Sequence, residues 1–130
     1  WSSRAPFGGF SEVAPWLPIS DDHRSRAVDV QDAAPDSVLN AFRRFLGWRR
    51  QHPALRVGSI RFVDAPSGTV ALVREHAGKR VLAAFNLTRD PAVVPITDVK
   101  SLSGHGFGGE LTPSGIELPP YGAFFGELPW

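Results

Sequence analysis

The spacing of apolar residues between Asp36 and Pro53 predicts a helix with an unusually wide apolar face. At about 100° per residue, the stripe consists of Val38, Phe42, Phe45 and Leu46, with Leu39 at its edge and Ala41 and Trp48 widening it. Asp36 or Ser37 can cap the first turn, and Pro53 is expected to end the helix. The arc covers about half of the circumference, which exceeds the stripe of roughly 100° on an ordinary surface helix. Such a helix is expected to pack against two separate parts of a structure.

Downstream of Leu55 the pattern changes to short apolar runs separated by turn residues, which is typical of β-strands. Strands are expected within GSIRFVDAPSG, TVALVREHAGKRVLAAFNL, PAVVPI, GELTPSGIEL and PPYGAFFGELPW, with a hairpin at Ala77-Gly78. The residues expected in the core include Phe62, Phe85, Phe124 and Phe125. Several short strands at close spacing predict an antiparallel β-sandwich.

Residues 1–35 are expected to form a long loop, because prolines recur and Gly8-Gly9 interrupts any strand. Four large aromatic residues lie in it: Trp1, Phe7, Phe10 and Trp16. They can anchor the loop on a core, since leaving each in water costs ~1.5–3 kcal/mol. Alternatively they form the rim of a sugar pocket, because aromatic faces stack on the C–H faces of sugar rings. Both uses favour the same residues.

Composition excludes several classes of protein. The net charge of +1 gives no reason to expect nucleic-acid or anionic-membrane binding, and no apolar run reaches the ~20 residues of a membrane span. The chain has no Cys, so it has neither a disulfide nor a thiolate zinc site. It also has no Met and begins with Trp1, so we expect it to be an excised or trimmed piece of a longer protein.

No catalytic residue, cofactor or metal site is predicted from local motifs. The histidines, His23, His52, His76 and His105, have no metal-ligand spacing, and the carboxylates suggest no catalytic pair. The run SGHGFGG lacks the Lys-Ser/Thr of a phosphate loop and is expected to be a flexible turn. The triplet Asn86-Leu87-Thr88 matches the N-glycosylation pattern, which matters only in a secreted eukaryotic protein.

The order of motifs resembles the C-terminal part of α-glucosidases and oligo-1,6-glucosidases in glycoside hydrolase family 13, the α-amylase superfamily. The motifs run WSSRAPFGGFS, PWLPI, DVQ, DSVLNAFRRFLGWRRQHPALRVG, RVLAAFNLT and LPPYGAFFGEL. The resemblance covers essentially the whole chain and is most specific in residues 7–58. The later strands match mainly in pattern.

The resemblance implies a (β/α)₈ barrel followed by an antiparallel Greek-key β-sandwich. Residues 1–53 would be the last barrel loop and helix, and residues 54–130 the sandwich. The family uses a retaining mechanism with an Asp nucleophile, a Glu acid/base and a second Asp, none of which matches a position in this sequence. The chain alone is therefore expected to be inactive, with its α-glucoside substrate bound by the missing barrel. Trp1, Phe7, Phe10 and Trp16 would border that pocket.

Three functions stay open at this point. The first is an exo-acting α-glucosidase, cytoplasmic and bacterial, for which no cofactor is expected. The second is a free-standing carbohydrate-binding or protein-interaction sandwich, and the third is glucosyl transfer or trehalose synthesis on the same scaffold. For the isolated chain we expect the Val38, Phe42, Phe45 and Leu46 face to be exposed, covered by residues 1–35, or used for self-association.

Overall fold

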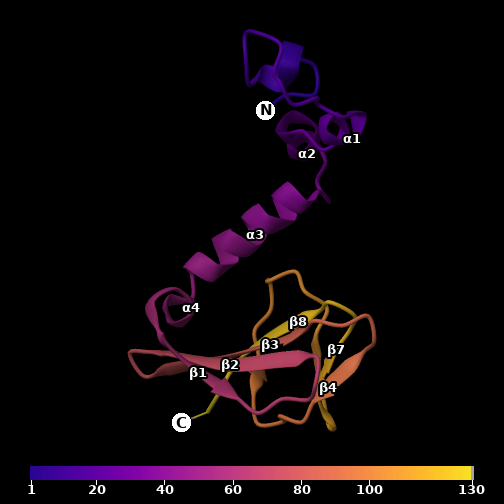
Figure 1. Ribbon diagram of the computed structural model, residues 1–130. Coiled ribbons are helices and arrows are strands. Elements are labelled where there is room, and N and C mark those ends of the chain that lie inside the picture. The colour runs from indigo at the N-terminus through magenta and orange to yellow at the C-terminus, as the bar shows by residue number, and fades with distance from the viewer. Residues whose placement is uncertain (130) are drawn as a thin grey trace. The chain divides into compact units, whose positions relative to one another are not determined.

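The computed structural model describes residues 1–129, which form two compact units. The first unit spans Trp1–Arg44 and the second begins at Phe45. The boundary lies inside one helix, so each unit is described by itself (Figure 1). None of the helices in residues 1–129 has the length and hydropathy that a membrane span requires.

The first unit contains short helices where the sequence predicted only a loop. These are the 3₁₀ turn η1 (Pro6–Gly9), α1 (Asp21–Ser25) and α2 (Val28–Ala33). The side chain of Ser20 caps α1 by accepting a hydrogen bond from the backbone N–H of His23. Each helix has at most two turns, and this length is too short for an apolar period to be visible in the sequence.

The long predicted helix is α3 (Val38–Arg50), and Pro53 begins a further helix, α4 (Pro53–Val57). Ser37 is the cap, because its Oγ accepts a hydrogen bond of 3.2 Å from the N–H of Asn40. Arg49 and Arg50 occupy the last turn, where positive charge suits the helix dipole. Pro53 has no N–H to lose at the first position of a helix, so it both ends α3 and starts α4.

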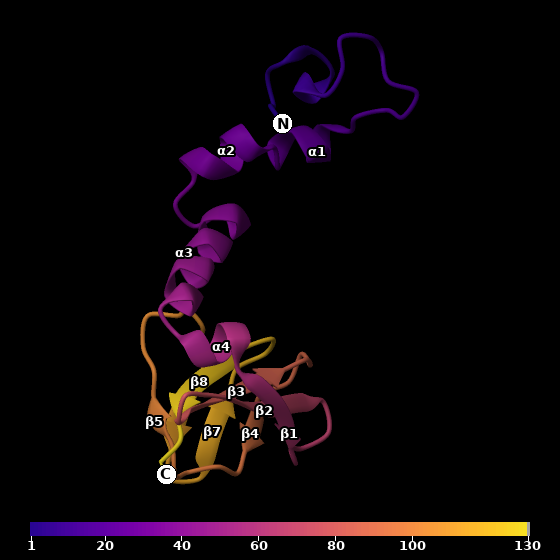
Figure 2. The same ribbon diagram turned by 90° about the vertical axis from the view of Figure 1, so that its left-hand side faces the viewer.

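The second unit is built from two antiparallel sheets, and the predicted Greek-key sandwich is confirmed (Figures 1 and 2). The five-stranded sheet has the order β1 (Ser59–Val63), β2 (Thr69–His76), β3 (Lys79–Asn86), β8 (Ala123–Glu127) and β5 (Lys100–Ser101). The three-stranded sheet has the order β4 (Ala92–Val94), β7 (Gly115–Leu118) and β6 (Glu110–Thr112). The chain crosses repeatedly between the sheets, so β3 pairs with β8 although they are distant in sequence.

Strand β3 separates two apolar cores, which agrees with the nearly continuous apolar run from Val81 to Phe85. Leu82 and Ala84 face the core between the sheets, which also holds Val94, Ile116, Leu118 and Phe124. Val81 and Ala83 face the opposite side of the five-stranded sheet, where they pack with Trp48, Ala54, Leu55 and Phe125. Burying a large side chain of this kind contributes ~1.5–3 kcal/mol.

The expectation that Phe62 lies in the core is wrong. Its side chain is 69% exposed, while Phe124 and Phe125 are buried as predicted and Phe85 is half-buried. Phe62 lies on β1, the edge strand of the five-stranded sheet, opposite Leu72 on the face that carries α4. Within residues 1–129 no other element covers Phe62 at this edge. The side chain therefore stays exposed although β1 alternates apolar and polar residues.

Candidate functional site

The four aromatic residues predicted for a pocket rim do not form one wall. Trp1 and Phe10 contact each other, with ring centroids 5.4 Å apart, and Trp1 also meets His23 edge-on at 6.2 Å. Phe7 lies in the adjacent turn with a φ of 51°. Trp16 is 91% exposed and has no ring partner within residues 1–129. The structure therefore brings Trp1, Phe7 and Phe10 into one turn and leaves Trp16 apart.

A shallow open depression accompanies this turn. Its volume is about 510 Å³, and it is lined by Ala5, Pro6, Phe7, Gly9, Phe10, Ser11 and Glu12. Neither Trp1 nor Trp16 lines it. A ligand site normally encloses most of its ligand, so this depression is not by itself a binding pocket.

Asp29 holds the N-terminal segment in place. Its carboxylate accepts hydrogen bonds from Ser2 Oγ at 2.7 Å, from the backbone N–H of Ser3 at 3.0 Å and from Ser3 Oγ at 3.1 Å. The Ser2 hydroxyl, followed by the Ser3 N–H, lowers the pKa of Asp29 to about 2. Arg24 adds a hydrogen bond from Nη1 to the Ser3 carbonyl at 3.1 Å. Asp29 thus anchors Ser2 and Ser3 to α2.

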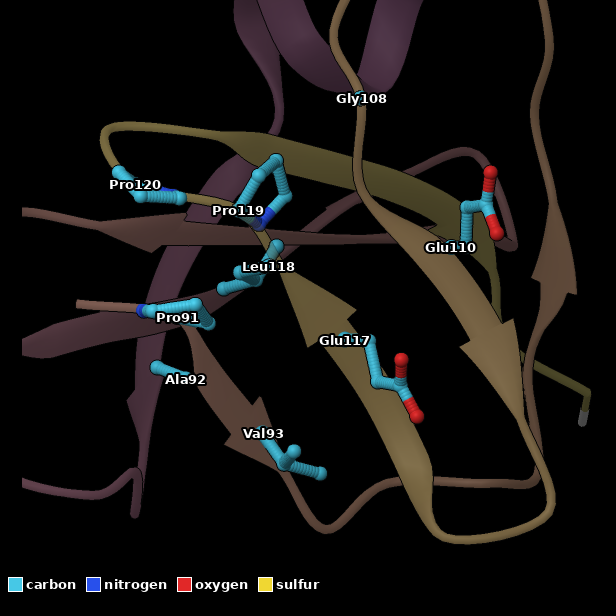
Figure 3. Close-up of a pocket in the computed structure, with 9 residues that line it drawn as sticks. All are labelled: Pro91, Ala92, Val93, Gly108, Glu110, Glu117, Leu118, Pro119 and Pro120. Atoms are coloured by element: carbon cyan, nitrogen blue, oxygen red, sulfur yellow. The ribbon is translucent and has the colours of Figure 1, made fainter.

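The second unit contains an open pocket of about 340 Å³ on the three-stranded sheet (Figure 3). Pro91, Pro119 and Pro120 form part of its wall, and Glu110 and Glu117 face the same side of the sheet. These two glutamates are directly opposite each other on β6 and β7, and both are exposed. A glycosidase acid needs a shielded, apolar setting that keeps its proton, and this open face does not provide one.

The histidines do not form a metal centre. No cluster of three metal-ligating side chains occurs in residues 1–129. His105 is buried, and its Nδ1 accepts a hydrogen bond of 3.1 Å from the N–H of Phe107. His52 lies against Trp48, with ring centroids 4.3 Å apart. Both histidines therefore have packing roles.

Trp48 is the centre of an aromatic cluster that sequence reasoning did not predict. Phe45, His52, His105 and Phe125 surround it, with ring centroids between 4.3 and 5.8 Å away. Its Nε1–H donates a hydrogen bond of 2.8 Å to the carbonyl of Ser103. The glycine-rich run suggested only flexibility, but its His and Phe are the residues that cover this side of α3.

Comparison with known proteins identifies the scaffold. No family model matches the chain. The chain is 42% identical over 130 residues to a probable α-glucosidase of Rhizobium meliloti (strain 1021), and the match covers 98% of this chain and 23% of that protein. The chain belongs to glycoside hydrolase family 13. The resemblance inferred from the motif order is confirmed.

Two further relatives agree with this assignment. A probable oligo-1,6-glucosidase 2 of Bacillus subtilis (strain 168) is 30% identical over 87 residues, which cover 65% of this chain and 15% of that protein. The crystal structure of XgtA, an α-glucosyl transfer enzyme, matches 99% of this chain and 24% of that chain, with 38% identity and a TM-score of 0.87. The chain thus spans about a quarter or less of these relatives and corresponds to their C-terminal part.

The motifs that carried the family 13 resemblance hold the start of α3. Asn40 Nδ2 donates to the backbone carbonyls of Gln31, Asp32 and Ala34 at 2.9–3.1 Å. The Gln31 side chain accepts from the N–H of Leu39 at 3.2 Å, and Ser37 Oγ donates to the Gln31 carbonyl at 2.6 Å. Gln31 and the Ser37–Asn40 motif are therefore structural, because they join the end of α2 to the first turn of α3.

Asn86 in the NLT motif is likewise structural. Its side chain is only 2% exposed, and its Nδ2 donates to the carbonyls of Asp90 at 2.7 Å and Pro119 at 3.0 Å. Its Oδ1 accepts from both the N–H and the hydroxyl of Thr88. An amide engaged in this way is not available for glycosylation in the folded chain.

Proposed function

We propose that this chain is the C-terminal part of an exo-acting α-glucosidase that removes terminal α-linked glucose from maltose or isomalto-oligosaccharides. The observation that carries the proposal is the 42% identity to the probable α-glucosidase of R. meliloti over 98% of the chain. The probable oligo-1,6-glucosidase of B. subtilis supports activity on isomalto-oligosaccharides. The reaction would retain the anomeric configuration, with a carboxylate nucleophile and a carboxylic acid as the acid/base.

The role proposed for this chain is structural. In the shared barrel architecture, the catalytic groups lie on loops at the C-terminal ends of the barrel strands. We assign residues 1–53 to the last loop and helix of such a barrel and residues 54–130 to its supporting sandwich. Trp1, Phe7, Phe10 and Trp16 would then help to shape the sugar pocket once the rest of the barrel is present.

The two ends of α3 support this assignment. Toward its C-terminal end, Trp48 is 8% exposed and is held within the second unit. Toward its N-terminal end, Val38 is 81% exposed and Phe42 is 57% exposed. An apolar helix face of this kind calls for an apolar partner. In the proposed assignment, this partner is the rest of the barrel.

Kinetics of the full-length enzyme test the proposed activity. Turnover would be measured on maltose, isomaltose, sucrose and trehalose, with the anomer of the released glucose followed by NMR. We expect hydrolysis of maltose or isomaltose with retention, and no turnover by the 130-residue chain. Inversion of configuration, or activity on none of the α-glucosides, would refute the proposal.

Titration of the 130-residue chain with maltose is the companion measurement, and millimolar or tighter binding would indicate a carbohydrate-binding module instead.

A second candidate is glucosyl transfer on the same scaffold. The likeness to XgtA, a transfer enzyme that is 38% identical over 99% of this chain, favours it. Transfer and hydrolysis differ in whether water or a second hydroxyl compound attacks the glucosyl intermediate. The full-length enzyme would therefore be assayed with maltose in the presence of an acceptor alcohol. Cleavage of maltose always releases one glucose as the leaving group, and hydrolysis releases a second glucose. If glucosides of the acceptor form faster than this second glucose is released, transfer is the main activity.

A further inference from the structure

Residues 102–109, here called the glycine-rich loop, cover one side of Trp48. Both ends of the loop are tied to β8, through hydrogen bonds from the N–H of Leu102 to the Phe125 carbonyl and from the N–H of Gly109 to the Ala123 carbonyl. Gly104 has a φ of +86°, and a Cβ built there would lie 3.4 Å from Cδ1 of Trp48. Only the middle of the loop, which includes His105, is free to move without breaking the sheet.

His105 holds this middle section down. Its ring is packed against Trp48, Phe107 and Phe125, with centroids 5.4, 5.8 and 5.2 Å away. Its Nδ1 accepts the backbone N–H of Phe107 at 3.1 Å. A neutral imidazole that accepts at Nδ1 carries its proton on Nε2. The closed loop therefore requires one particular tautomer of the neutral ring.

We propose that the glycine-rich loop is a pH-sensitive latch, closed on Trp48 while His105 is neutral and opened by protonation of its Nδ1. An imidazolium has no acceptor, so the Phe107 N–H would face another donor. The charged ring would also lie among aromatic side chains that cannot solvate it as water does. Opening the loop exposes His105 to water and relieves both penalties.

The surroundings of His105 favour this response. Trp48 and Phe45 on α3 and Phe125 on β8 carry no charge, and His52, which lies against Trp48, is the titratable group of the same aromatic cluster. In the described residues, no carboxylate lies within 4.0 Å of His105 to stabilise an imidazolium. Burial lowers the pKa of His105, and a hydrogen bond to the Leu102 backbone partly opposes this. The latch is therefore set to close at neutral pH and open in acid.

Opening would loosen α3. The Phe107 ring contacts Phe45 edge-on at 5.2 Å, and the Ser103 carbonyl accepts the Trp48 indole N–H. Both contacts belong to the middle of the loop and would be lost together. The C-terminal half of α3 would then be held by its remaining contacts to the five-stranded sheet, including the one between Trp48 and Phe125.

NMR of the 130-residue chain tests the latch directly. At neutral pH, the ¹⁵N shifts of His105 should report the Nε2–H tautomer, and the Phe107 amide should be protected from hydrogen exchange. As pH falls from the pKa of His105 in the open loop toward its lower pKa in the closed loop, we expect the protection factor of the Phe107 amide to drop by up to about tenfold per pH unit. A Nδ1–H tautomer at neutral pH, or a protection factor that does not change through the titration, would overturn the proposal.

Two substitutions sharpen the test. His105→Gln removes the titrating group, so the acid-dependent loss of Phe107 protection should disappear, whereas the matched control His76→Gln, at an exposed histidine, should leave it as in the wild type. Persistence of the loss in His105→Gln would refute the latch. If His105→Gln does not fold, the wild-type titration still decides. No substrate is involved, so this outcome is independent of the proposed glucosidase activity.

Discussion

The indole nitrogen of Trp48 lies 2.8 Å from the carbonyl oxygen of Ser103, and this hydrogen bond links positions 55 residues apart. It joins α3 to the glycine-rich loop between β5 and β6. Around it, Phe45, His105 and Phe125 complete a largely apolar cluster. This cluster is what attaches the end of α3 to the five-stranded sheet.

We predict that Trp48→Ala strongly destabilises the chain. It removes a buried ring and its hydrogen bond, and loss of a core Trp costs about 3–5 kcal/mol. Phe42→Ala on the same helix is the matched control, because Phe42 is 57% exposed and a surface change of this kind alters stability by about 0.5 kcal/mol or less. Urea unfolding of the 130-residue chain measures both. Equal effects of the two substitutions would contradict the burial of Trp48.

The cross-strand pair Glu110 and Glu117 predicts a stabilising substitution. Like charges directly opposite each other on neighbouring strands repel, and both side chains face the open pocket of Figure 3. Glu117→Lys replaces repulsion with attraction, so we expect a gain of about 0.2–1 kcal/mol that shrinks at high salt. Thermal unfolding at two ionic strengths would measure it.

A matched substitution on the other sheet should have the opposite sign. Glu75 is opposite Arg80 in the β2–β3 hairpin, so Glu75→Lys places two positive charges together. We expect a loss of similar size, about 0.2–1 kcal/mol. If both lysine substitutions shift stability in the same direction, the cross-strand charge explanation is wrong.

Asn86 is predicted to be important for stability because its amide joins three segments. Its Nδ2 donates to carbonyls of Asp90 and Pro119, and its Oδ1 accepts from Thr88. Asn86→Asp removes the donors but keeps the shape, which leaves acceptor facing acceptor at a buried side chain, at a cost of about 1–3 kcal/mol. Thr88→Val, which removes only a hydroxyl at a partly exposed position, should cost less. Chemical denaturation would rank the two, and a reversed order would contradict the role of the amide.

Much of the sandwich could be predicted from the sequence, because its strands carry local information. Ala77-Gly78 closes the β2–β3 hairpin with φ values of 48° and 78°, as a two-residue turn with Gly should. Val81–Phe85 is an apolar run, and four of its five residues are buried. β5, with only two residues, has no pattern to detect and was missed.

The aromatic cluster could not be predicted because it depends on contacts distant in sequence. His105 and Phe107 stand among glycines, and nothing local indicates that they cover Trp48. Phe62 was misassigned for the converse reason, since its strand has the right alternation but lies at an edge. The four rim aromatics stay a prediction, because their function depends on the part of the barrel outside this chain.

The pKa of His52 depends on burial and on two charged side chains. Burial lowers its pKa, the positive charge of Lys79 lowers it further, and Glu127 partly opposes them. Lys79 and Glu127 line a small pocket of about 190 Å³ together with His52. Removing either charge should therefore move the pKa of His52 in a predictable direction.

We expect Lys79→Gln to raise the pKa of His52 and Glu127→Gln to lower it, as followed by the His52 ring proton in an NMR titration. The direction in which pH changes the free energy of unfolding follows from the lowered pKa of His52 in the wild-type chain. Because the pKa is lower in the folded state than in the unfolded state, the unfolded chain takes up a proton first as pH falls. The contribution of neutral His52 is thus complete above the unfolded pKa of about 6.5 and is lost as pH falls through the folded pKa. His52→Gln should make the free energy of unfolding less pH-dependent between pH 7.5 and 5.5. If the Lys79 and Glu127 variants shift the pKa of His52 in the same direction, the electrostatic account is wrong.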